Sequence, residues 1–591
     1  MNPTRTPIRS LALLGIALLA LAGCASVAPR EPVTLRLIAL NDFHGNLEST
    51  GLVLGWPDPA QPGRAARLAT GGAAAIAGTV TALRASAPNS LVVSSGDMIG
   101  GTPLISALFR HESTIDIANR IGVDIAAPGN HEFDAGTAEY LRVLGGGCAA
   151  NDPKSNTVSC ALEPYRGARF VTVAANVERV AGGTLFPPAT VREIGGIKVG
   201  FIGAVTESTP TIVVPSGVAG LRFTEEAGAI NRAAAELQRQ GVQAIVVLIH
   251  EGGNTGEPGQ PLDWNNNDCP NARGPIFDIV RRLSPAVDVV FSAHSHQGYN
   301  CLLGGRPVMQ ATALGRGLSV VDLVLDPKTG DVDRSRTLHR NLPVLNASTE
   351  PALRAAVLAA EPAPWRAVLE RAVPDAAVAE RVAAYARAAA PIASREVARI
   401  VGGFDRTGRS DSSAARLIAD AQWMATRAPD RGGSMLALMN PGGVRSDLAC
   451  RGTPPCPVTY GDVFTVQPFG NSLVVMTLTG AEFRNLLESQ QPPGRERPTL
   501  LIPSASLSYR WVASAPFGQR VQDLRLAGQP VAPDQRVRLT VNSFMADGGD
   551  GFGVLRNGRE RLGGELDLDA LVTWLQSGPA PIATPRITLG E

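Results

Sequence analysis

The chain of 591 residues is longer than one domain usually is, because domains commonly hold about 100–200 residues. Hydrophobic residues make up 44% of it and charged residues 18%, which is typical of a globular protein and excludes a disordered one. The formal net charge is +1, so no overall field attracts nucleic acid or acidic lipid. No nucleic-acid partner is therefore expected, and an anionic ligand must be held by a local site.

The N-terminal segment 1–23 is predicted to be a signal peptide. Its first ten residues contain arginine and no acidic residue, and thirteen apolar or small residues follow, "LALLGIALLALAG". A membrane-spanning helix needs about 20 residues, so this run is too short to span and fits the core of a signal peptide.

The segment ends in "LAGC", which resembles the lipobox of bacterial lipoproteins. The resemblance implies cleavage before Cys24 and a lipid on its sulfur, which would anchor the chain to a membrane. The alternative is an ordinary secretory signal in which Cys24 is incidental. Ala25 and Ser26 follow without an aspartate, which in such lipoproteins favours the outer membrane. The expected location is exported and periplasmic, with a lipid anchor in the outer membrane.

The six other cysteines are even in number and lie in sequence-near pairs. Their spacers are polar and rich in proline and glycine, which favours disulfides in an oxidising compartment. Six cysteines allow many pairings, and we expect that of neighbours: Cys148 with Cys160, Cys269 with Cys301, and Cys450 with Cys456. No CxxC pair occurs, so a structural zinc site is not expected.

From residue 33 to residue 330 apolar, strand-like segments alternate with helical ones. The strand-like segments run into polar or glycine-rich loops, as in "SLVVSSGDMIGG", "AIVVLIHEGG" and "VDVVFSAHSHQ". The segments "GGAAAIAGTVTALRA" and "AGAINRAAAELQRQ" between them are typical of helices. This alternation predicts an α/β domain, in which ligands gather beyond the carboxyl ends of the strands.

After this domain the composition changes twice. Residues 345–392 are rich in alanine, glutamate and arginine and are broken by prolines, and we expect a helical connection there. Val378, Val382 and Tyr385 lie within it at helical spacing. Residues 396–591 are predicted to form a second α/β or α+β domain, with strands at "SLVVMTLTG" and "QRVRLTVNSF".

Five of the seven histidines fall in loops at the ends of predicted strands. A single histidine is more often structural than a metal ligand, but that explanation fails for five in the same structural position. Carboxylates and an amide share these loops, and oxygen and imidazole ligands together suit a divalent ion. The set exceeds what one ion uses and suits two ions joined by a carboxylate, as in metal-assisted phosphoryl hydrolysis. Its members are Asp42, His44, Asp97, Asn130, His131, Asp134, His250, His294 and His296.

The segments that carry these residues resemble, in order, the blocks of the calcineurin-like metallophosphoesterases: "NDFHG", "SSGDMIGG", "PGNHEFD", "LIHEGG" and "FSAHSHQ". The whole arrangement is similar to the bacterial 5′-nucleotidase and UDP-sugar hydrolase family, which adds a C-terminal nucleotide-recognition domain. The resemblance covers nearly all of the mature chain. It implies an N-terminal metallophosphoesterase α/β sandwich over residues 33–330 and a C-terminal α/β or α+β substrate-binding domain over residues 396–591.

The resemblance also implies two divalent ions, whether Mn²⁺, Zn²⁺, Mg²⁺, Co²⁺ or Ca²⁺. One ion would take Asp42, His44, Asp97 and His296, and the other would take Asp97, Asn130, His250 and His294. Asp97 would then bridge the two ions. Asp42 and His44 are expected to reach one ion because residues two apart in an extended strand end point the same way. Some relatives have glutamine in place of His296, so the added nitrogen could alter the metal preference.

His131 and Asp134 are implied to act on the substrate rather than on the metals. His131 would lie beside the scissile phosphate, with Asp134 orienting its ring. An imidazolium there stabilises charge that develops on the phosphoryl oxygens or on the leaving group. The alternative for His131 is a neighbour of the metal ligands without a catalytic role.

The C-terminal domain carries three segments that resemble the recognition motifs of the family: "MNPGGVRSDL", "VQPFGNSL" and "VNSFMADGGDGF". In the family two aromatic rings sandwich the base, an acid accepts the ribose hydroxyls, and arginine offers a fork to phosphate. Arg409, with Arg416 as a second choice, is the nearest match to a further phosphate-binding pattern, whose register is shifted here. That shift favours monophosphates or cyclic nucleotides over longer phosphate chains. The implied substrate residues are Arg409, Asn440, Arg445, Phe469, Asn471, Phe544 and Asp550.

These features together predict an exported two-metal hydrolase that removes phosphate from nucleotides, as a 5′-nucleotidase does, by attack of a metal-bound hydroxide. Rotation between the domains is implied, with the hinge near residues 376–390, because metal and recognition residues lie on different domains. The nearer alternative is a 2′,3′-cyclic-nucleotide phosphodiesterase or a UDP-sugar pyrophosphatase on the same site. An alternative from a different functional class is a surface lipoprotein that binds nucleosides or serves in adhesion and catalyses no reaction. The sequence leaves the oligomeric state and the preferred base open.

Overall fold

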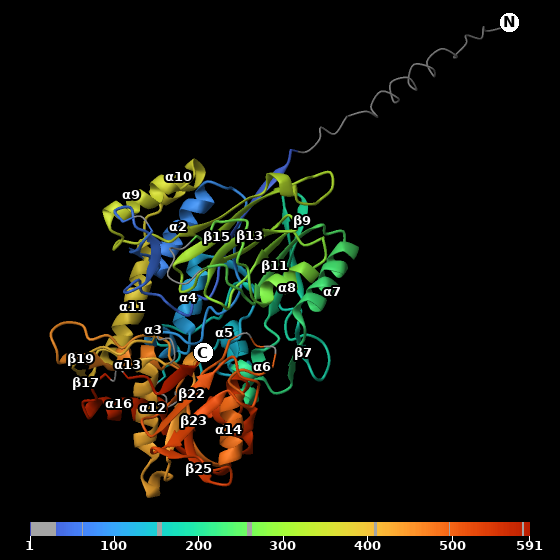
Figure 1. Cartoon of the computed structure of the whole chain (residues 1–591). Coiled ribbons are helices and arrows are strands. Elements are labelled where there is room, and N and C mark those ends of the chain that lie inside the picture. The colour runs from blue at the N-terminus through green and yellow to red at the C-terminus, as the bar shows by residue number, and fades with distance from the viewer. Residues whose placement is uncertain are drawn as a thin grey trace.

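The computed structural model describes residues 31–61, 63–150, 157–256, 263–406, 411–493, 495, 497–581 and 584–590, together with Met1. The predicted signal peptide, Cys24 and Arg409 lie outside these residues. Within the described ranges, no helix is both long enough and apolar enough to cross a bilayer. The chain folds into two α/β domains joined by helices, as the sequence predicts (Figure 1).

Two six-stranded sheets form the centre of the N-terminal domain. The first has the strand order β16-β15-β1-β4-β5-β6, in which β1, β4, β5 and β6 are parallel. The second has the order β13-β14-β12-β11-β9-β8, in which β14, β12, β11 and β9 are parallel. The strands of the first sheet are β1 (Val33–Leu40), β4 (Ser90–Ser94), β5 (Val123–Ala126), β6 (Val171–Thr172), β15 (Gly317–Leu325) and β16 (Leu338–Pro343). Those of the second sheet are β8 (Ala189–Ile194), β9 (Ile197–Val205), β11 (Ala244–His250), β12 (Val289–Phe291), β13 (Gly298–Leu303) and β14 (Arg306–Ala311).

An apolar core lies between the two sheets. Leu37 and Leu323 of the first sheet pack there with Phe201 and Leu248 of the second, and all four are fully buried. β11 is buried at every position, as expected of a parallel strand that is covered on both faces. Helices cover the outer faces, so the domain has four layers. The helices on the first sheet are α2 (Ala73–Ala85) and α4 (Glu112–Ile121), and those on the second are α7 (Glu226–Arg239) and α8 (Pro275–Arg282).

Three helices follow one another between the two domains. They are α9 (Pro351–Ala360), α10 (Ala363–Arg371) and α11 (Ala376–Ala393). Figure 1 shows α11 running from the side of α2 toward the C-terminal domain. It contacts α2 and α4 of the N-terminal domain and α13 (Tyr460–Val466) of the C-terminal one. The buried face of α11 carries Val378, Val382 and Tyr385, so their helical spacing reflects packing.

The C-terminal domain contains a five-stranded sheet of order β21-β18-β25-β20-β26 and a four-stranded sheet of order β24-β23-β22-β27. The two strands predicted from sequence are β20 (Ser472–Thr479) and β25 (Arg536–Asn542), which pair antiparallel. The remaining strands of the two sheets are β18 (Leu436–Met439), β21 (Ile502–Pro503), β22 (Leu507–Val512), β23 (Val521–Leu526), β24 (Gln529–Pro530), β26 (Arg559–Leu566) and β27 (Ile587–Gly590). The longer helices of the domain are α12 (Ser413–Thr426), α14 (Gly480–Glu488) and α16 (Asp567–Gln576).

The disulfides follow the predicted pairing of neighbours. Cys148 is bonded to Cys160, Cys269 to Cys301, and Cys450 to Cys456. All six cysteines that follow Cys24 in the sequence are thus used in disulfides, and none of the six is left as a free thiol.

Candidate active site

The predicted metal ligands lie at the carboxyl ends of parallel strands. The strands belong to both sheets of the sandwich, so the ligands meet where the carboxyl edges of the two sheets adjoin. This is the edge at which α/β sheets bind ligands. Asp42 and His44 follow β1, Asp97 follows β4, Asn130 follows β5, His250 ends β11, and His294 and His296 follow β12.

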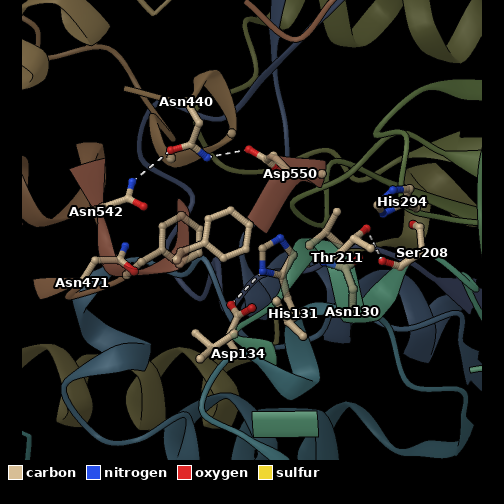
Figure 2. Close-up of a pocket in the computed structure, with 18 of the residues that line it drawn as sticks. Asn130, His131, Asp134, Ser208, Thr211, His294, Asn440, Asn471, Asn542 and Asp550 are labelled. Atoms are coloured by element: carbon tan, nitrogen blue, oxygen red, sulfur yellow. Dashed lines mark hydrogen bonds and ion pairs between the residues drawn. The ribbon is translucent and has the colours of Figure 1, made fainter. Parts of the chain in front are cut away.

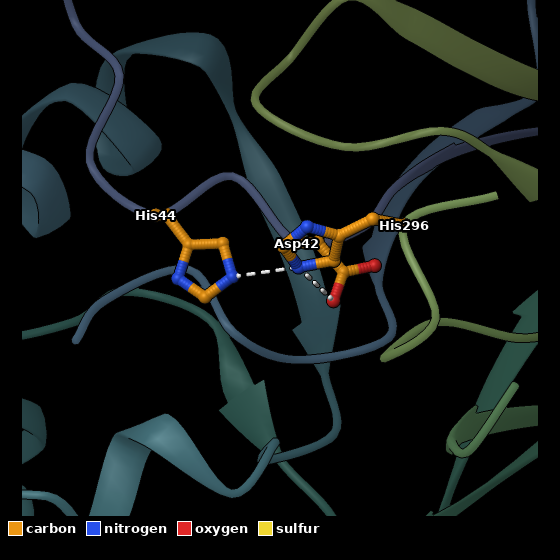
Figure 3. A group of neighbouring side chains, drawn as sticks. All are labelled: Asp42, His44 and His296. Carbon is orange, nitrogen blue, oxygen red and sulfur yellow. Dashed lines mark hydrogen bonds and ion pairs between the residues drawn. The ribbon is translucent and has the colours of Figure 1, made fainter. Parts of the chain in front are cut away.

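A first group of ligand atoms belongs to Asp42, His44 and His296, and these atoms lie within 4.8 Å of one another (Figure 3). Nε2 of His296 is 3.6 Å from Oδ1 of Asp42 and 3.1 Å from Nε2 of His44. Atoms bound about 2.0–2.2 Å from one ion lie roughly 3–4 Å apart. The separations therefore fit ligands that share one ion.

A second group belongs to Asp97, His250 and His294, again within 4.8 Å of one another. Oδ2 of Asp97 lies 3.1 Å from Nε2 of His250. The same oxygen lies 3.6 Å from Nε2 of His44 in the first group. One carboxylate therefore borders both groups, which is the position that a bridging ligand requires.

A buried amide oxygen and a buried imidazole nitrogen face this centre. Oδ1 of Asn130 has no hydrogen-bond partner among the described residues, and Nε2 of His250 contacts the carboxylate of Asp97 at 3.1 Å. The Nδ1 atoms of His44 and His250 face the carbonyl oxygens of Gly100 and Ser95 at 2.7 and 2.8 Å, to which they can only donate. This fixes the tautomer and leaves each Nε2 lone pair toward the centre, as in metal-binding histidines. The residues present thus fit divalent ions.

The electrostatics of the centre favour the binding of a cation. Burial raises the pKa of Asp42 to about 7 and lowers that of His44 to about 3. Burial also acts to lower the pKa of His250, but Asp97 and Asp42 outweigh it and raise that pKa to about 10. A divalent ion would stabilise both carboxylates and displace the His250 proton.

The backbone explanation given for Asp42 and His44 is wrong. β1 ends at Leu40, and both residues follow it with left-handed φ angles of 47° and 46° rather than in extended conformation. Asp97 has a φ of 51°. Such angles are uncommon outside glycine and cost free energy, and they concentrate at functional sites. The ligands reach the centre through left-handed turns after the strands.

Two glycines allow the loops after β4 and β5 to touch. A Cβ at Gly96 would lie 2.3 Å from the backbone nitrogen of Gly129. A Cβ at Gly129 would lie 2.1 Å from Oδ1 of Asp97 and 2.7 Å from Nδ1 of His250. The glycines in "SSGDM" and "PGNHE" are thus required by contact between backbone and ligands.

Glu132 holds these two loops together, and sequence reasoning missed it. Its buried carboxylate accepts hydrogen bonds from the backbone N–H groups of Asp97 at 2.9 Å, Met98 at 2.8 Å and Gly129 at 2.6 Å. It lies in the quoted segment "PGNHEFD", where an acid among the ligands was the available signal. Glu132 positions the loops that carry Asp97 and Asn130.

His131 and Asp134 form the predicted pair beside the ligands. Nδ1 of His131 is 2.7 Å from Oδ2 of Asp134. The backbone nitrogen of His131 donates to Oδ1 of Asp97 at 2.9 Å, and its ring lies 5.1 Å from the ring of His44. Burial acts to lower the pKa of His131, but Asp134 and Asp97 outweigh it and raise the pKa above its ordinary value. A cationic imidazole is therefore favoured at the edge of the centre.

A cavity of about 510 Å³ opens beside this pair and is lined by both domains. In Figure 2, Asn130, His131 and Asp134 lie on one side of it, and Asn440 and Asp550 lie on the other. The structure thus brings the metal ligands and the recognition segments to one space. Its lining includes, from the predicted site, Asn130, His131, Asp134, His294, Asn440, Arg445, Phe469, Asn471, Phe544 and Asp550.

Hydrogen bonds order the polar wall of this cavity. Nδ2 of Asn440 donates to Oδ2 of Asp550 at 2.7 Å, and Nδ2 of Asn542 donates to Oδ1 of Asn440 at 3.0 Å. Oδ1 of Asn471 accepts from Oγ of Ser543 at 3.2 Å. Asn542, which the sequence reading did not single out, thereby fixes the amide of Asn440 so that it supports Asp550.

The aromatic and basic residues of the C-terminal domain reach the metal side. The ring of Phe469 is stacked on that of His131, with centroids 5.8 Å apart and planes 14° apart. The guanidinium carbon of Arg445 lies 5.7 Å from the Phe469 centroid. A Cβ at Gly101, in the loop after β4, would lie 3.3 Å from NH2 of Arg445. Arg445 therefore lies beside the loop that follows β4 and carries Asp97.

Of the two arginines expected from "DRTGRSDSSAARLIADA", only Arg416 belongs to the described residues, and it does not line the cavity. Arg409 lies outside the described residues. Arg416 is buried in α12 and forms an ion pair with Asp411, so it serves the core of its own domain. Arg495 lines the cavity instead and acts electrostatically on Asp550. It lies in a loop rich in proline and glycine, and no motif singled it out.

Both halves of the chain match known protein families. Residues 35–298 match the model of the calcineurin-like phosphoesterase family, and residues 391–557 match the C-terminal domain of 5′-nucleotidases. The chain is 32% identical over 588 residues to Endonuclease YhcR of Bacillus subtilis, and the match covers 95% of this chain but 42% of that protein. It is 27% identical to a probable 5′-nucleotidase of Treponema pallidum, with 95% and 94% of the two chains covered.

A solved structure agrees over the whole length. The crystal structure of the 5′-nucleotidase precursor from Thermus thermophilus is 26% identical and superposes with a TM-score of 0.72. The match covers 94% of this chain and 99% of the other. Together with the two ligand groups, these matches support the use of divalent metals. The chain belongs to the family that joins a calcineurin-like phosphoesterase domain to a 5′-nucleotidase C-terminal domain, and it is a metal-dependent phosphoric ester hydrolase.

Proposed function

We propose that the enzyme removes phosphate from nucleoside 5′-monophosphates at a centre of two divalent ions. The observation that carries this proposal is the shared cavity, in which Asn130 and His131 face Phe469, Phe544 and Asp550. A phosphate at the metal centre would then be joined to a nucleoside that lies against the C-terminal domain. Relatives named as 5′-nucleotidases support the same substrate class.

The ligand sets of the two proposed ions overlap at Asp97. Bound ions would polarise the phosphoryl oxygens and lower the pKa of a water molecule. The position of Oδ2 of Asp97, near His250 and His44 at once, supports a bridging role. The proposed ligands are Asp42, His44, Asp97 and His296 for one ion and Asp97, Asn130, His250 and His294 for the other.

His131 is proposed to stabilise the transition state, with Asp134 as its positioning residue. Because Asp134 faces Nδ1, the opposite nitrogen of the ring is free to donate toward the cavity. Donors that are already oriented toward developing charge lose little free energy to reorganisation. The raised pKa of His131 supports the charged, donating form.

The recognition residues are proposed to divide between phosphate, ribose and base. Arg445 would hold phosphate, since it approaches Gly101 beside the metal loops. Asp550, fixed by Asn440, would accept the ribose hydroxyls. Phe469 and Phe544 would stack on the base, with Asn471 near its polar edge. For Arg409, phosphate binding stays a prediction from sequence.

Removing an aromatic ring from the base site should weaken substrate binding. Stacking of a base on an aromatic ring contributes about 1–3 kcal/mol, so Phe544→Ala is expected to raise KM for AMP by about 5- to 150-fold. The comparison substrate is ribose 5-phosphate, which has no base and should show little change in KM. An equal rise in KM for both substrates would mean that Phe544 supports the fold rather than the base.

The proposed function is tested by release of phosphate from AMP. The mature protein would be stripped with a chelator and resupplied with Mn²⁺, Mg²⁺, Zn²⁺, Co²⁺ or Ca²⁺ in separate reactions. We expect release to stop on chelation and to return with at least one ion. No release of phosphate from AMP with any ion would contradict the proposal, although the family and fold would stand.

The protein is proposed to be exported and anchored to a membrane by lipid. The "LAGC" segment and the three disulfides support an exported chain that begins at Cys24 with a lipid anchor in the outer membrane. Mass spectrometry of the mature N-terminus should find lipid on Cys24, and another N-terminus would contradict the anchor.

The helices α9, α10 and α11 support a division of the chain into a catalytic domain at residues 33–330, a helical connection at residues 345–392 and a substrate-binding domain at residues 396–591. The proposed hinge between the domains lies in α11.

A further inference from the structure

A second cavity of about 520 Å³ borders His296, one of the proposed metal ligands. His294 lines the first cavity, whereas His296, two residues later, lines the second. The side chain of His296 is 32% exposed, so it forms part of this wall while its Nε2 faces Asp42. The proposed metal centre is therefore bordered by two cavities, and the nucleoside monophosphate of the proposed reaction occupies only the first.

The second cavity has a polar and mainly cationic lining. Its walls include Arg273, Arg316 and Arg497, and the one acid among its described lining residues is Asp263. Arg273 and Arg316 donate hydrogen bonds to backbone carbonyls rather than to carboxylates in the described part of the chain. Asparagine side chains add neutral donors and acceptors. They are Asn254, Asn266 and Asn271. A lining of this kind suits an anionic group that also carries hydroxyls.

Thr312 is a strained residue on the wall of the second cavity. It is branched at Cβ yet has a left-handed φ of 61°, which costs free energy and persists only where the surroundings enforce it. Thr312 is 5% exposed, and its hydroxyl has no hydrogen-bond partner among the residues described. Its carbonyl accepts from Nδ2 of Asn41 at 2.5 Å, and that group also donates to Asp42. Thr312 thus links the cavity to a metal ligand and offers an unused hydroxyl.

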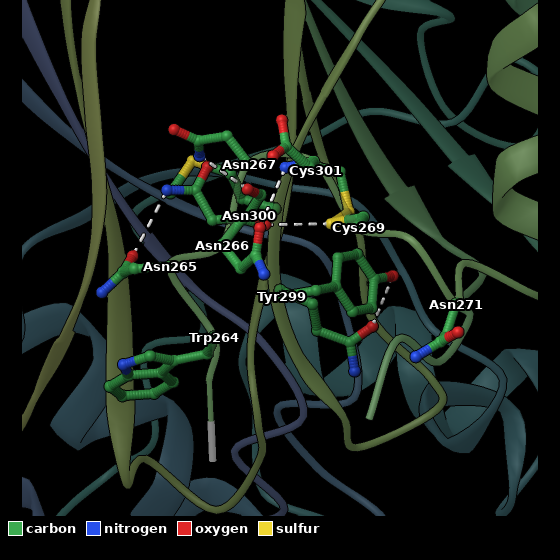
Figure 4. Close-up of a disulfide and its surroundings, with 12 residues drawn as sticks. Trp264, Asn265, Asn266, Asn267, Cys269, Asn271, Tyr299, Asn300 and Cys301 are labelled. Carbon is green, nitrogen blue, oxygen red and sulfur yellow. Dashed lines mark hydrogen bonds between the residues drawn. A yellow bond between two sulfur atoms is a disulfide. The ribbon is translucent and has the colours of Figure 1, made fainter. Parts of the chain in front are cut away.

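A disulfide fixes one wall of the cavity (Figure 4). The bond between Cys269 and Cys301 ties the asparagine-rich loop to β13, the strand that follows His296. Trp264 anchors the start of the loop, since it is 2% exposed and its ring meets that of Trp56 edge to face at 6.3 Å. A wall held in this way loses little conformational freedom when a ligand binds.

We propose that the second cavity binds the second substituent of a phosphodiester, and that this substituent carries a further phosphate. The inference rests on the proposed function, because it places the scissile phosphorus at the same metal centre. A phosphomonoester has one organic substituent, which the first cavity holds. A phosphodiester has two, and the two cavities, one lined by His294 and the other by His296, match them in number.

The reaction is an ordinary hydrolysis. The oxygen of water bonds to phosphorus, and the bond from phosphorus to the nucleoside 5′-oxygen breaks. That oxygen takes up a proton supplied by the water. The nucleoside leaves the first cavity, and the second substituent keeps the phosphate as a monoester. The dinucleotide pApA, bound with its 3′-terminal adenosine in the first cavity, would therefore give adenosine and adenosine 3′,5′-bisphosphate.

The test compares AMP, ApA and pApA as substrates of the mature enzyme loaded with Mn²⁺. ApA lacks only the terminal phosphate of pApA. The first variant carries Arg273→Gln and Arg497→Gln together. The second carries Arg497→Gln alone, which replaces an exposed side chain and therefore disturbs the fold less. The control is Arg239→Gln at the exposed end of α7, where Arg239 pairs only with Glu236 among the described residues. Products and initial rates would be measured by chromatography.

We expect kcat/KM to be higher for pApA than for ApA in the wild type. The double variant should lower the ratio of kcat/KM for pApA to that for ApA by about tenfold, since each lost contact is a charge-assisted hydrogen bond. The single variant should shift the ratio in the same direction, and Arg239→Gln should leave it unchanged. An unaltered ratio in folded variants, or phosphate and ApA as the sole first products from pApA, would overturn the proposal. Failure of the wild type on AMP as well would instead contradict the proposed function.

Discussion

Replacing His131 with alanine is expected to lower kcat for AMP by about 10²–10⁴-fold, the usual contribution of a positioned acid–base or donor group. Nδ1 of His131 is held at 2.7 Å from Asp134, which orients the ring, and the pKa of His131 is raised above its ordinary value, which favours the charged form. The proposed ligands of both ions are other residues, so the metal content should not change. The measurement is kcat together with metal analysis of the purified variant.

Two controls separate catalysis from folding. His339→Ala removes a histidine of β16 whose Nδ1 meets Oδ1 of Asn300 at 2.7 Å, away from the centre, and kcat should stay close to that of the wild type. Asp134→Asn should lower kcat less than His131→Ala does, because the donor is kept and only its orientation is weakened. A His131→Ala enzyme with near-normal kcat would show that the histidine is only a neighbour of the metal ligands.

Replacing Asp97 with asparagine is expected to abolish measurable release of phosphate from AMP. Asparagine keeps the volume of the side chain but removes the charge, and Oδ2 of Asp97 is the atom that borders both ligand groups. The variant should bind both ions more weakly than the wild type. The measurement is metal content after dialysis, followed by activity over a range of Mn²⁺ concentrations.

His296→Gln is the informative comparison for Asp97→Asn. His296 borders one ligand group, and glutamine keeps an oxygen ligand, so activity should fall less and should recover at high Mn²⁺. Asp278→Asn, in the exposed first turn of α8, is the matched control for loss of an aspartate charge. Full metal content and activity in Asp97→Asn would mean that this carboxylate does not bridge the ions.

The sequence was informative where local patterns meet simple topology. Apolar runs that end in Asp, His or Gly predicted the strand ends, and β11 and His250 lie as that pattern requires. The even number of cysteines only made disulfides expected, and the pairing of neighbours such as Cys269 and Cys301 was one of several that the count allowed. Because parallel strands gather their carboxyl ends at one edge, even residues distant in sequence could be placed together.

Other features depend on conformations and contacts that no local pattern records. The left-handed turns at Asp42 and His44 could not be read from strand alternation, which led to the wrong explanation. Glu132 was overlooked because its role lies in bonds to the backbone of another loop. Arg495 and Thr312 carry no motif and gain their places only when distant loops close around the two cavities.

The central claim is the pair of ions bridged by Asp97, and anomalous diffraction from a crystal grown with Mn²⁺ tests it most directly. Data collected at the manganese edge should show two peaks, one among Asp42, His44, Asp97 and His296 and one among Asp97, Asn130, His250 and His294. Asp97 should lie between the two peaks. A single peak, or peaks away from these side chains in an active crystal, would contradict the two-metal account.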